Sequence, residues 1–464
     1  MGAEQDIIVA IELGSSAIRG IAGQKGPDGN MKILAIEQEN VKECVHRGVI
    51  FNIDKTTRAI RLIKDRLEEK LNANITRAYV GLSGQSLHTV SNKILHDLGQ
   101  YVKITSSHID RLMDENHNTQ YPKRVILETI PQEYLVDNNR TNEPEGIQGS
   151  QIEGNFLNII SLATLRDNIL KCLKEANIAL AELLISPLEL AKHLLPDSEK
   201  RSGCVLVDMG AETTTVSIYS DNLLRHLVVI PLGGKNVNKD ICTVCNVGIE
   251  EAETLKTKNA VAFVAKNNSE DDVKRTVSLS NDRVCNVAEL QEIVSARIEE
   301  IIRNVWNQVE NSQWRDKLLS GIVLTGGAAS QPQMIDAFKT ITTYDKVKMA
   351  RCLMETTTST PGIGANDDIS LNTLIALMLS GNESCAVEKV ATPVEPVIEP
   401  VVNEDKTPAT PNTPYQDTSS PEDELIIEDE EKEEEKPTPK KKKTNFFTRV
   451  GNIITTMVNE DEED

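Results

Sequence analysis

The sequence predicts an α/β protein with two related domains around one ligand, and three stretches carry this prediction. Residues 203–219 read as an apolar strand ending at Asp208, a glycine-containing turn and a second, alternating strand, which is the pattern of a β-hairpin. Residues 7–21 follow the same plan around Glu12. A third strand, within 321–330, runs into a pair of glycines. Two copies of one turn design, about 195 residues apart, indicate a duplicated domain.

Both hairpin turns have the chemistry of a phosphate-binding turn. Glycine lets the backbone approach a ligand closely, and exposed N–H groups point at the anion. The bare backbone that should open a helix at 326–328 suits a base or a phosphate. Each stretch alone could equally be an ordinary polar turn, and their order along the chain favours the nucleotide interpretation. The candidate phosphate contacts are Gly14, Ser15, Ser16, Gly210, Thr213 and Thr214.

Hydrophobic periodicity predicts the remaining elements. The first 83 residues alternate between strand and helix signals, whereas the stretch from 84 to about 161 changes to short β-like runs and polar helices. Strands are expected at 7–13, 17–24, 31–38, 78–82 and 180–185, and helices at 55–73, 164–176, from 236, within 248–260 and at 287–310.

Composition excludes some classes of function. A net charge of −21 and an aromatic content of 3% disfavour a nucleic-acid-binding protein. No signal peptide is visible, and the eight cysteines are scattered, which points to reduced thiols in the cytoplasm. The pair Cys242-x-x-Cys245 could bind a metal or act in redox chemistry, but no second pair with suitable spacing accompanies it.

With these motifs in this order, residues 6–385 resemble the actin/Hsp70/sugar-kinase ATPase superfamily, and more closely the FtsA family of bacterial cell-division proteins. The resemblance implies an actin-like ATPase fold with ATP between its two domains. It also implies that Glu12 and Asp208 hold Mg²⁺, largely through water. The helix with Glu253-x-x-Lys256 should reach the ribose and base, although this pair could also be a solvated ion pair. The adenosine contacts that the resemblance implies are Gly234, Glu253, Lys256, Gly326, Gly327 and Ala328.

Two residues depart from the pattern of the relatives. The family usually has Asp where this chain has Glu12, whose side chain is longer and therefore shifts the carboxylate. Mg²⁺ requires nearly ideal octahedral geometry, so this shift affects how the carboxylate can bind it. Chaperone and MreB-like relatives orient the attacking water with a Glu where this chain has Ser186. A hydroxyl positions water less well, so we expect at most weak ATPase activity.

The resemblance also implies a division into subdomains. An FtsA-type inserted subdomain would make filament contacts, and subdomain 2B would capture the C-terminal tail of FtsZ, with Arg297 and Arg303 as candidate contacts on the outer face of the helix at 287–310. A stabilising insertion and two ordinary solvated arginines are the alternatives. The expected boundaries are 1–83 and 163–200 for 1A, 84–162 for the inserted 1C, 201–235 and 321–385 for 2A, and 236–320 for 2B.

The end of the chain has a different composition. Residues 386–443 are acidic and proline-rich, end in a lysine cluster, and should form a disordered linker. Residues 444–458 carry an apolar stripe at helical spacing, and at about 15 residues the helix is shorter than the roughly 20 that span a bilayer. It should lie in the membrane interface beside anionic lipid, or alternatively dock onto the protein or a partner. The membrane candidates are Lys441, Lys442, Phe446, Phe447, Val450, Ile453, Ile454 and Met457.

Together these features predict an ATP-binding, polymerising cell-division protein that tethers FtsZ filaments to the inner face of the cytoplasmic membrane at the division site. Other division proteins would be further partners. A small-molecule kinase of the same superfamily and a pilus-assembly scaffold of the PilM kind are the alternatives.

Overall fold

The computed structural model describes residues 6–26, 30–40, 44–264, 275–280, 283–360 and 368–388. All of them belong to the first of two compact units, 1–392 and 393–464. Most of the predicted linker, the lysine cluster with Lys441 and Lys442, and the predicted membrane helix at 444–458 lie outside the described residues. None of the helices in the described ranges is both long and apolar enough to cross a membrane.

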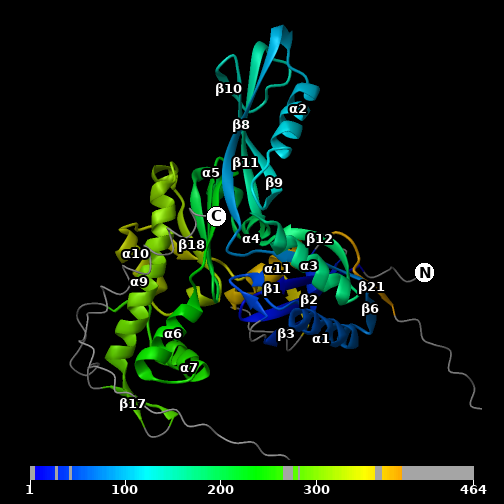
Figure 1. Cartoon of the computed structure of the whole chain (residues 1–464). Helices are drawn as coiled ribbons and strands as arrows, with labels where there is room; N and C mark the ends of the chain where they lie inside the picture. The colour runs from blue at the N-terminus through cyan, green and yellow to red at the C-terminus, as the bar shows by residue number, and fades with distance from the viewer. Residues whose placement is uncertain are drawn as a thin grey trace, which may run out of the picture. The chain divides into compact units, whose positions relative to one another are not determined.

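The first lobe is built on a six-stranded sheet of order β12-β7-β1-β2-β3-β20 (Figure 1). β1 pairs antiparallel with β2 and parallel with β7, so the N-terminal hairpin lies in the middle of the sheet. The strands are β1 Ile7–Leu13, β2 Ala17–Lys25, β3 Met31–Asn40, β7 Arg77–Leu82, β12 Ala179–Ile185 and β20 Thr358–Ser359. The helices are α1 Ile53–Leu71, α3 Ala163–Glu175, α4 Ser186–Leu194 and α11 Asn372–Leu379. The short α5 Asp197–Ser202 leads into the second lobe and packs against its strand Thr214–Ser220.

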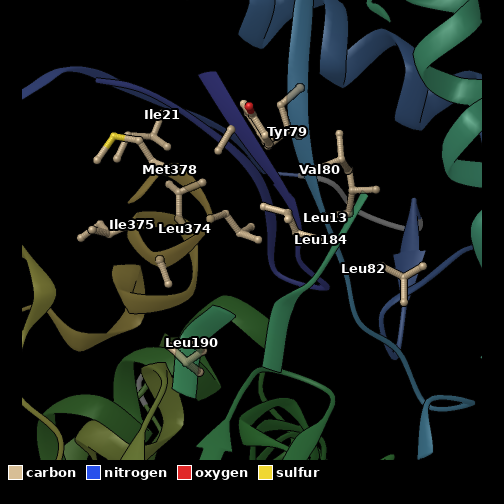
Figure 2. Packing of buried hydrophobic residues seen from close by; sticks show 14 of the residues in the cluster. Leu13, Ile21, Tyr79, Val80, Leu82, Leu184, Leu190, Leu374, Ile375 and Met378 are labelled. Carbon is tan, nitrogen blue, oxygen red and sulfur yellow. The ribbon is translucent and has the colours of Figure 1, made fainter. Parts of the chain in front are cut away.

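Apolar side chains from distant parts of the chain form the core of this lobe. Leu13, Val80 and Leu184, from three neighbouring strands, and Leu374 and Met378 of α11 belong to one buried cluster, part of which Figure 2 shows. Because helices cover both faces of the sheet, β1 is apolar at almost every position rather than at alternate ones. The apolar face of α1, the helix predicted at 55–73, is buried against β2 and β3.

The inserted subdomain differs from its prediction. Instead of short β-like runs and polar helices, it has three long strands and one helix: β8 His88–Lys103, α2 Ser106–His117, β9 Arg124–Val136 and β11 Gln148–Leu162, with the short β10 Asn139–Thr141. β11 pairs with both β8 and β9. One face of β8 is mostly exposed, so its sequence lacks the apolar signal of a buried strand. A small core around Leu112, Tyr134 and Phe156 holds the subdomain together.

The second lobe repeats the plan of the first. Its hairpin, β13 Cys204–Met209 with β14 Thr214–Ser220, is flanked by β18 Gly321–Thr325, which runs parallel to β13 as β7 does to β1. This repetition confirms the predicted two-domain α/β fold. The other strands are β15 Leu223–Ile230 and β19 Val347–Met349, and the helices are α6 Gly234–Cys245, α7 Ile249–Asn259, α9 Val287–Asn311 and α10 Met334–Thr342.

One junction joins the inserted subdomain to the second lobe. Val228 of β15 pairs with His88 of β8, so the insertion and this lobe share a nine-stranded sheet of order β10-β9-β11-β8-β15-β14-β13-β18-β19. The Thr89 hydroxyl donates to the Leu227 carbonyl at 3.3 Å and accepts from the Leu227 N–H at 2.9 Å. Gln132 of β9 donates to the Leu224 carbonyl at 3.1 Å.

The remaining described elements are short. They comprise β4 Val45–His46, β5 Val49–Ile50, β6 Ala73–Ile75, β16 Thr276–Ser278, β17 Val284–Asn286 and β21 Ala386–Glu388, and the 3₁₀ turns η2 Arg315–Lys317, η3 Gly327–Ser330, η4 Leu353–Thr356 and η5 Ile369–Leu371.

Candidate functional site

A cleft of about 990 Å³ lies where the two hairpin turns meet. Its size is in the range of small-molecule sites. Residues of both turns, of α6 and α7 and of the glycine pair after β18 line it together with Ser186 at the start of α4. The predicted site residues on its wall are Glu12, Gly14, Ser15, Ser16, Asp208, Gly210, Thr213, Gly234, Glu253, Lys256, Gly326, Gly327 and Ala328.

Thr214 is the exception, and its assignment to the ligand is wrong. Its side chain is buried, and its hydroxyl donates to the carbonyl of Leu232 at 2.8 Å. Side chains alternate along β14, so Thr213 and Thr215 line the cleft while Thr214 points to the opposite face. Thr215 takes its place among the candidate contacts.

Two carboxylates face the cleft, and nearby cations and hydrogen-bond donors balance their negative charges only in part. No group in the described part of the chain hydrogen-bonds to Oε2 of Glu12, and its cation, Nη1 of Arg19, is 3.6 Å away. Burial raises the pKa of Glu12 although Arg19 opposes the shift. Burial and then the nearby Glu12 raise the pKa of Asp208 to about 7, against a hydrogen bond from the Thr373 hydroxyl at 3.5 Å. Carboxylate oxygens are the ligands that Mg²⁺ prefers, so this pair fits a divalent cation.

Two features require a glycine at position 326: its backbone conformation and the atoms that surround it. Its φ is +89°, a region that other residues rarely adopt. A Cβ at this position would lie 2.3 Å from Oδ1 of Asp208 and 2.6 Å from the carbonyl oxygen of Met209. The turn after β18 therefore comes close to the carboxylate of the neighbouring strand only because it carries no side chain.

The opposite end of the cleft is formed by α6 and α7. Nζ of Lys256 is 2.8 Å from Oε2 of Glu253 and donates to the carbonyl of Gly234 at 3.4 Å. Burial favours a higher pKa for Glu253, but hydrogen bonds from Lys256 and Asn238 outweigh it and lower the pKa. The pair is thus an ion pair on the wall of the cleft, with the Lys256 side chain largely buried.

Three of the lining residues that were not predicted from the sequence could contact a ligand through polar or charged groups. Among the residues that the structure describes, none hydrogen-bonds to Oδ1 of the buried Asn238, which suits a ligand hydroxyl or amine. Lys235 and Arg19 are the other two. Asn238 follows Gly234 by one helical turn, so the helix period from the glycine could have identified it.

Arg297 and Arg303 differ in their surroundings. Arg297 was expected to be exposed, which is wrong: its side chain is 20% exposed and binds both carboxylate oxygens of Asp240 on α6. Hydrogen bonds to Asp240 are the largest cause of a raised Arg297 pKa. Arg303 is 62% exposed and pairs with Glu299 on its own helix. Arg303 is therefore the more accessible of the two candidates.

The cysteine pair is not arranged as a metal site. Cys242 and Cys245 lie on α6, and Sγ of Cys245 is 3.4 Å from Sγ of Cys285. Burial, followed by the contact with Cys285, raises the pKa of Cys245 to about 12. Among the residues that the structure describes, no group of three His, Cys, Asp or Glu side chains could hold a metal ion.

Comparison with known proteins identifies the family. Residues 205–371 match the family model "Cell division protein FtsA", and residues 84–160 match "SHS2 domain inserted in FTSA". The FtsA of Porphyromonas gingivalis is 31% identical over 74% of this chain and 73% of its own length. The FtsA of Bacillus subtilis is 28% identical over 70% of this chain and 74% of its own length.

A solved structure shows the same fold. It is a PilM-PilN type IV pilus biogenesis complex, with a TM-score of 0.58 and 14% identity over 80% of this chain and 97% of the other. At that identity the likeness extends to the fold alone. The family models and the relatives identify this chain as a member of the FtsA family of actin-like cell-division proteins.

Proposed function

We propose that this chain binds Mg²⁺ and ATP in the cleft, polymerises in an actin-like manner and tethers FtsZ filaments to the inner face of the cytoplasmic membrane at the division site. Membership of a cell-division family supports the cellular role. The observation that carries the nucleotide claim is the convergence of both turns and the turn at Gly326 on one cleft that holds two poorly compensated carboxylates.

Each part of the cleft has a task in this proposal. Backbone N–H groups and hydroxyls of the turns at 14–16 and 210–213, together with Thr215, bind the phosphates. Glu12 and Asp208 hold Mg²⁺, largely through water, and the cation neutralises phosphate charge. Adenosine is held by Gly234, Glu253, Lys256, Gly326, Gly327 and Ala328.

Nucleotide in this cleft acts mainly as a structural ligand. Ser186 lines the cleft with a hydroxyl at the start of α4, and a hydroxyl orients an attacking water less well than a carboxylate. A ligand that contacts both lobes favours the arrangement in which both sets of contacts are made. We therefore expect ATP to control assembly and turnover to be slow.

Calorimetry with the full chain tests the nucleotide claim. We expect ATP to bind in the presence of Mg²⁺ and binding to be lost in Asp208→Ala. The matched control is Asp345→Ala, which removes an exposed carboxylate from the same lobe. An affinity for ATP that Asp208→Ala leaves unchanged would refute the proposed site.

A second experiment tests the partner. An acidic peptide with the sequence of an FtsZ C-terminal tail should bind the full chain, and binding should weaken in Arg303→Glu. Arg315→Glu is a suitable control because that arginine is also about half exposed. A chain that ignores the peptide would remove FtsZ from the proposal while leaving the nucleotide claim intact.

A further inference from the structure

Lys235 is fixed by its backbone beside the second phosphate turn. Its N–H donates to the carbonyl of Ala211 at 2.7 Å, and the N–H of Gly234 donates to the carbonyl of Gly210 at 3.0 Å. The first turn of α6 is therefore attached directly to the turn that follows β13. The direction in which the Lys235 side chain leaves the helix is set by these two bonds.

The side chain of Lys235 connects the two phosphate turns. Its Nζ donates to the carbonyl of Ser15 in the first turn at 2.6 Å and to Oε1 of Glu212 in the second at 2.9 Å. The side chain is 32% exposed and lines the cleft. One ammonium group thus lies at the point where the two lobes approach each other and where a ligand can reach it.

Glu212 has donors other than Lys235. Its Oε2 accepts from the backbone N–H of Arg47 at 2.8 Å, and Nδ1 of His46 is 3.6 Å away. Burial favours a higher pKa for Glu212, but the Arg47 amide and Lys235 outweigh it and lower the pKa. The carboxylate would keep its contacts with the first lobe if Lys235 turned toward a ligand.

The other basic residues on the cleft wall are engaged elsewhere. Arg19 pairs with Glu12 and donates to the carbonyl of Ser370 at 3.2 Å. Lys256 pairs with Glu253 at the adenosine end. The two turns themselves offer backbone N–H groups and hydroxyls but no cationic side chain. A triphosphate is highly negative whereas adenosine is uncharged, and phosphates bind most strongly to charged donors.

We infer that Lys235 is a specificity-determining residue that recognises the terminal phosphate of the nucleotide and so distinguishes ATP from ADP. The inference rests on the proposed function of the cleft. Lysine binds phosphate as a point charge on a flexible stem, so it can exchange the Ser15 carbonyl and the Glu212 carboxylate for phosphate oxygens. Glu212 competes with the phosphate for the same ammonium group. Removal of its charge should therefore not weaken ATP binding.

Calorimetric titration of the full chain with ATP, ADP and adenosine, each with Mg²⁺, tests the inference. Lys235→Met keeps the apolar stem and should weaken ATP binding about 10- to 100-fold, the equivalent of one charge-assisted hydrogen bond. ADP should lose less, and adenosine should lose nothing. Lys235→Arg should restore part of the preference for ATP. Lys239→Met, an exposed lysine on the same helix, is the control.

Glu212→Gln separates recognition from a structural role. If Lys235 recognises phosphate, removal of the competing charge leaves ATP affinity equal or higher. If the pair only ties the lobes together, Glu212→Gln and Lys235→Met weaken ATP, ADP and adenosine by similar factors, which would overturn the inference. A wild-type chain that binds adenosine and ADP but does not prefer ATP would refute the inference alone. One that binds no nucleotide would refute the proposed function with it.

Discussion

Replacement of Asp208 by Asn should stabilise the ligand-free protein, with an effect that depends on pH. Burial and the nearby Glu12 raise the pKa of Asp208 from 3.8 to about 7, so ionisation is disfavoured in the folded chain relative to the unfolded one. The folded state therefore binds more protons than the unfolded state between these values, and stability falls as pH rises through this window. Above pH 7 the loss is complete and stays constant.

The magnitude follows from the width of the window. Each pH unit between the two pKa values costs about 1.4 kcal/mol. From pH 5 to pH 8 the advantage of the Asn variant over the wild type should therefore grow by roughly 2–3 kcal/mol. Glu12 also has a raised pKa, but it is present in both proteins, so its contribution largely cancels in the comparison.

Urea unfolding without Mg²⁺ or nucleotide, followed by circular dichroism at pH 5 and pH 8, measures this difference. Asp345→Asn is the control, because its carboxylate is exposed and the same chemical change should have little effect at either pH. An advantage of Asp208→Asn that is equal at both pH values would refute the reasoning. The same variant should bind ATP more weakly with Mg²⁺, so stability and binding should change in opposite directions.

Three further predictions concern other parts of the chain. Gly326→Ala should abolish ATP binding in calorimetry, because its Cβ would lie 2.3 Å from a carboxylate oxygen, whereas Gly99→Ala, at φ +70° with nothing within 4 Å, should lower stability by only about 1 kcal/mol and leave binding intact. Arg297→Met should lower the free energy of unfolding by roughly 1–3 kcal/mol because it leaves a partly buried carboxylate unpaired, and Arg303→Met by less than about 1 kcal/mol; equal values in urea unfolding would contradict this. Deletion of 444–458 should remove co-sedimentation with anionic liposomes, and unchanged co-sedimentation would exclude that segment as the anchor.

The sequence predicted the parts of the fold that depend on local pattern. The hairpins at Glu12 and Asp208 combine an apolar run, an acid and a glycine within a few residues, so both were found with their turns. The apolar stripe of α9 repeats over many turns, and the helix predicted at 287–310 is found at Val287–Asn311. Such signals are contained in one short stretch of chain.

The errors come from information that a single stretch does not contain. Pairing with the neighbouring strands decides which face of β14 each residue lies on, and a shift of one residue exchanges the two faces. The sequence around Thr214 does not contain this information, so Thr214 was assigned to the wrong face. Arg297 was expected to be exposed because its partner, Asp240, belongs to a different helix. The contact of Lys235 with Ser15 joins residues that belong to different lobes, and no spacing in the sequence indicates it.

The junction between β8 and β15 attaches the inserted subdomain to the second lobe as well as to the first. Its chain enters after β7 and leaves into α3, both in the first lobe, yet its sheet continues into the second lobe through Val228 and His88. The hydrogen bonds of Thr89 and Gln132 are part of this second attachment. A rotation of one lobe against the other must therefore either break these bonds or swing the insertion. If the inserted subdomain swings, the end of it that is far from the cleft would be displaced by more than the distance by which the cleft walls separate.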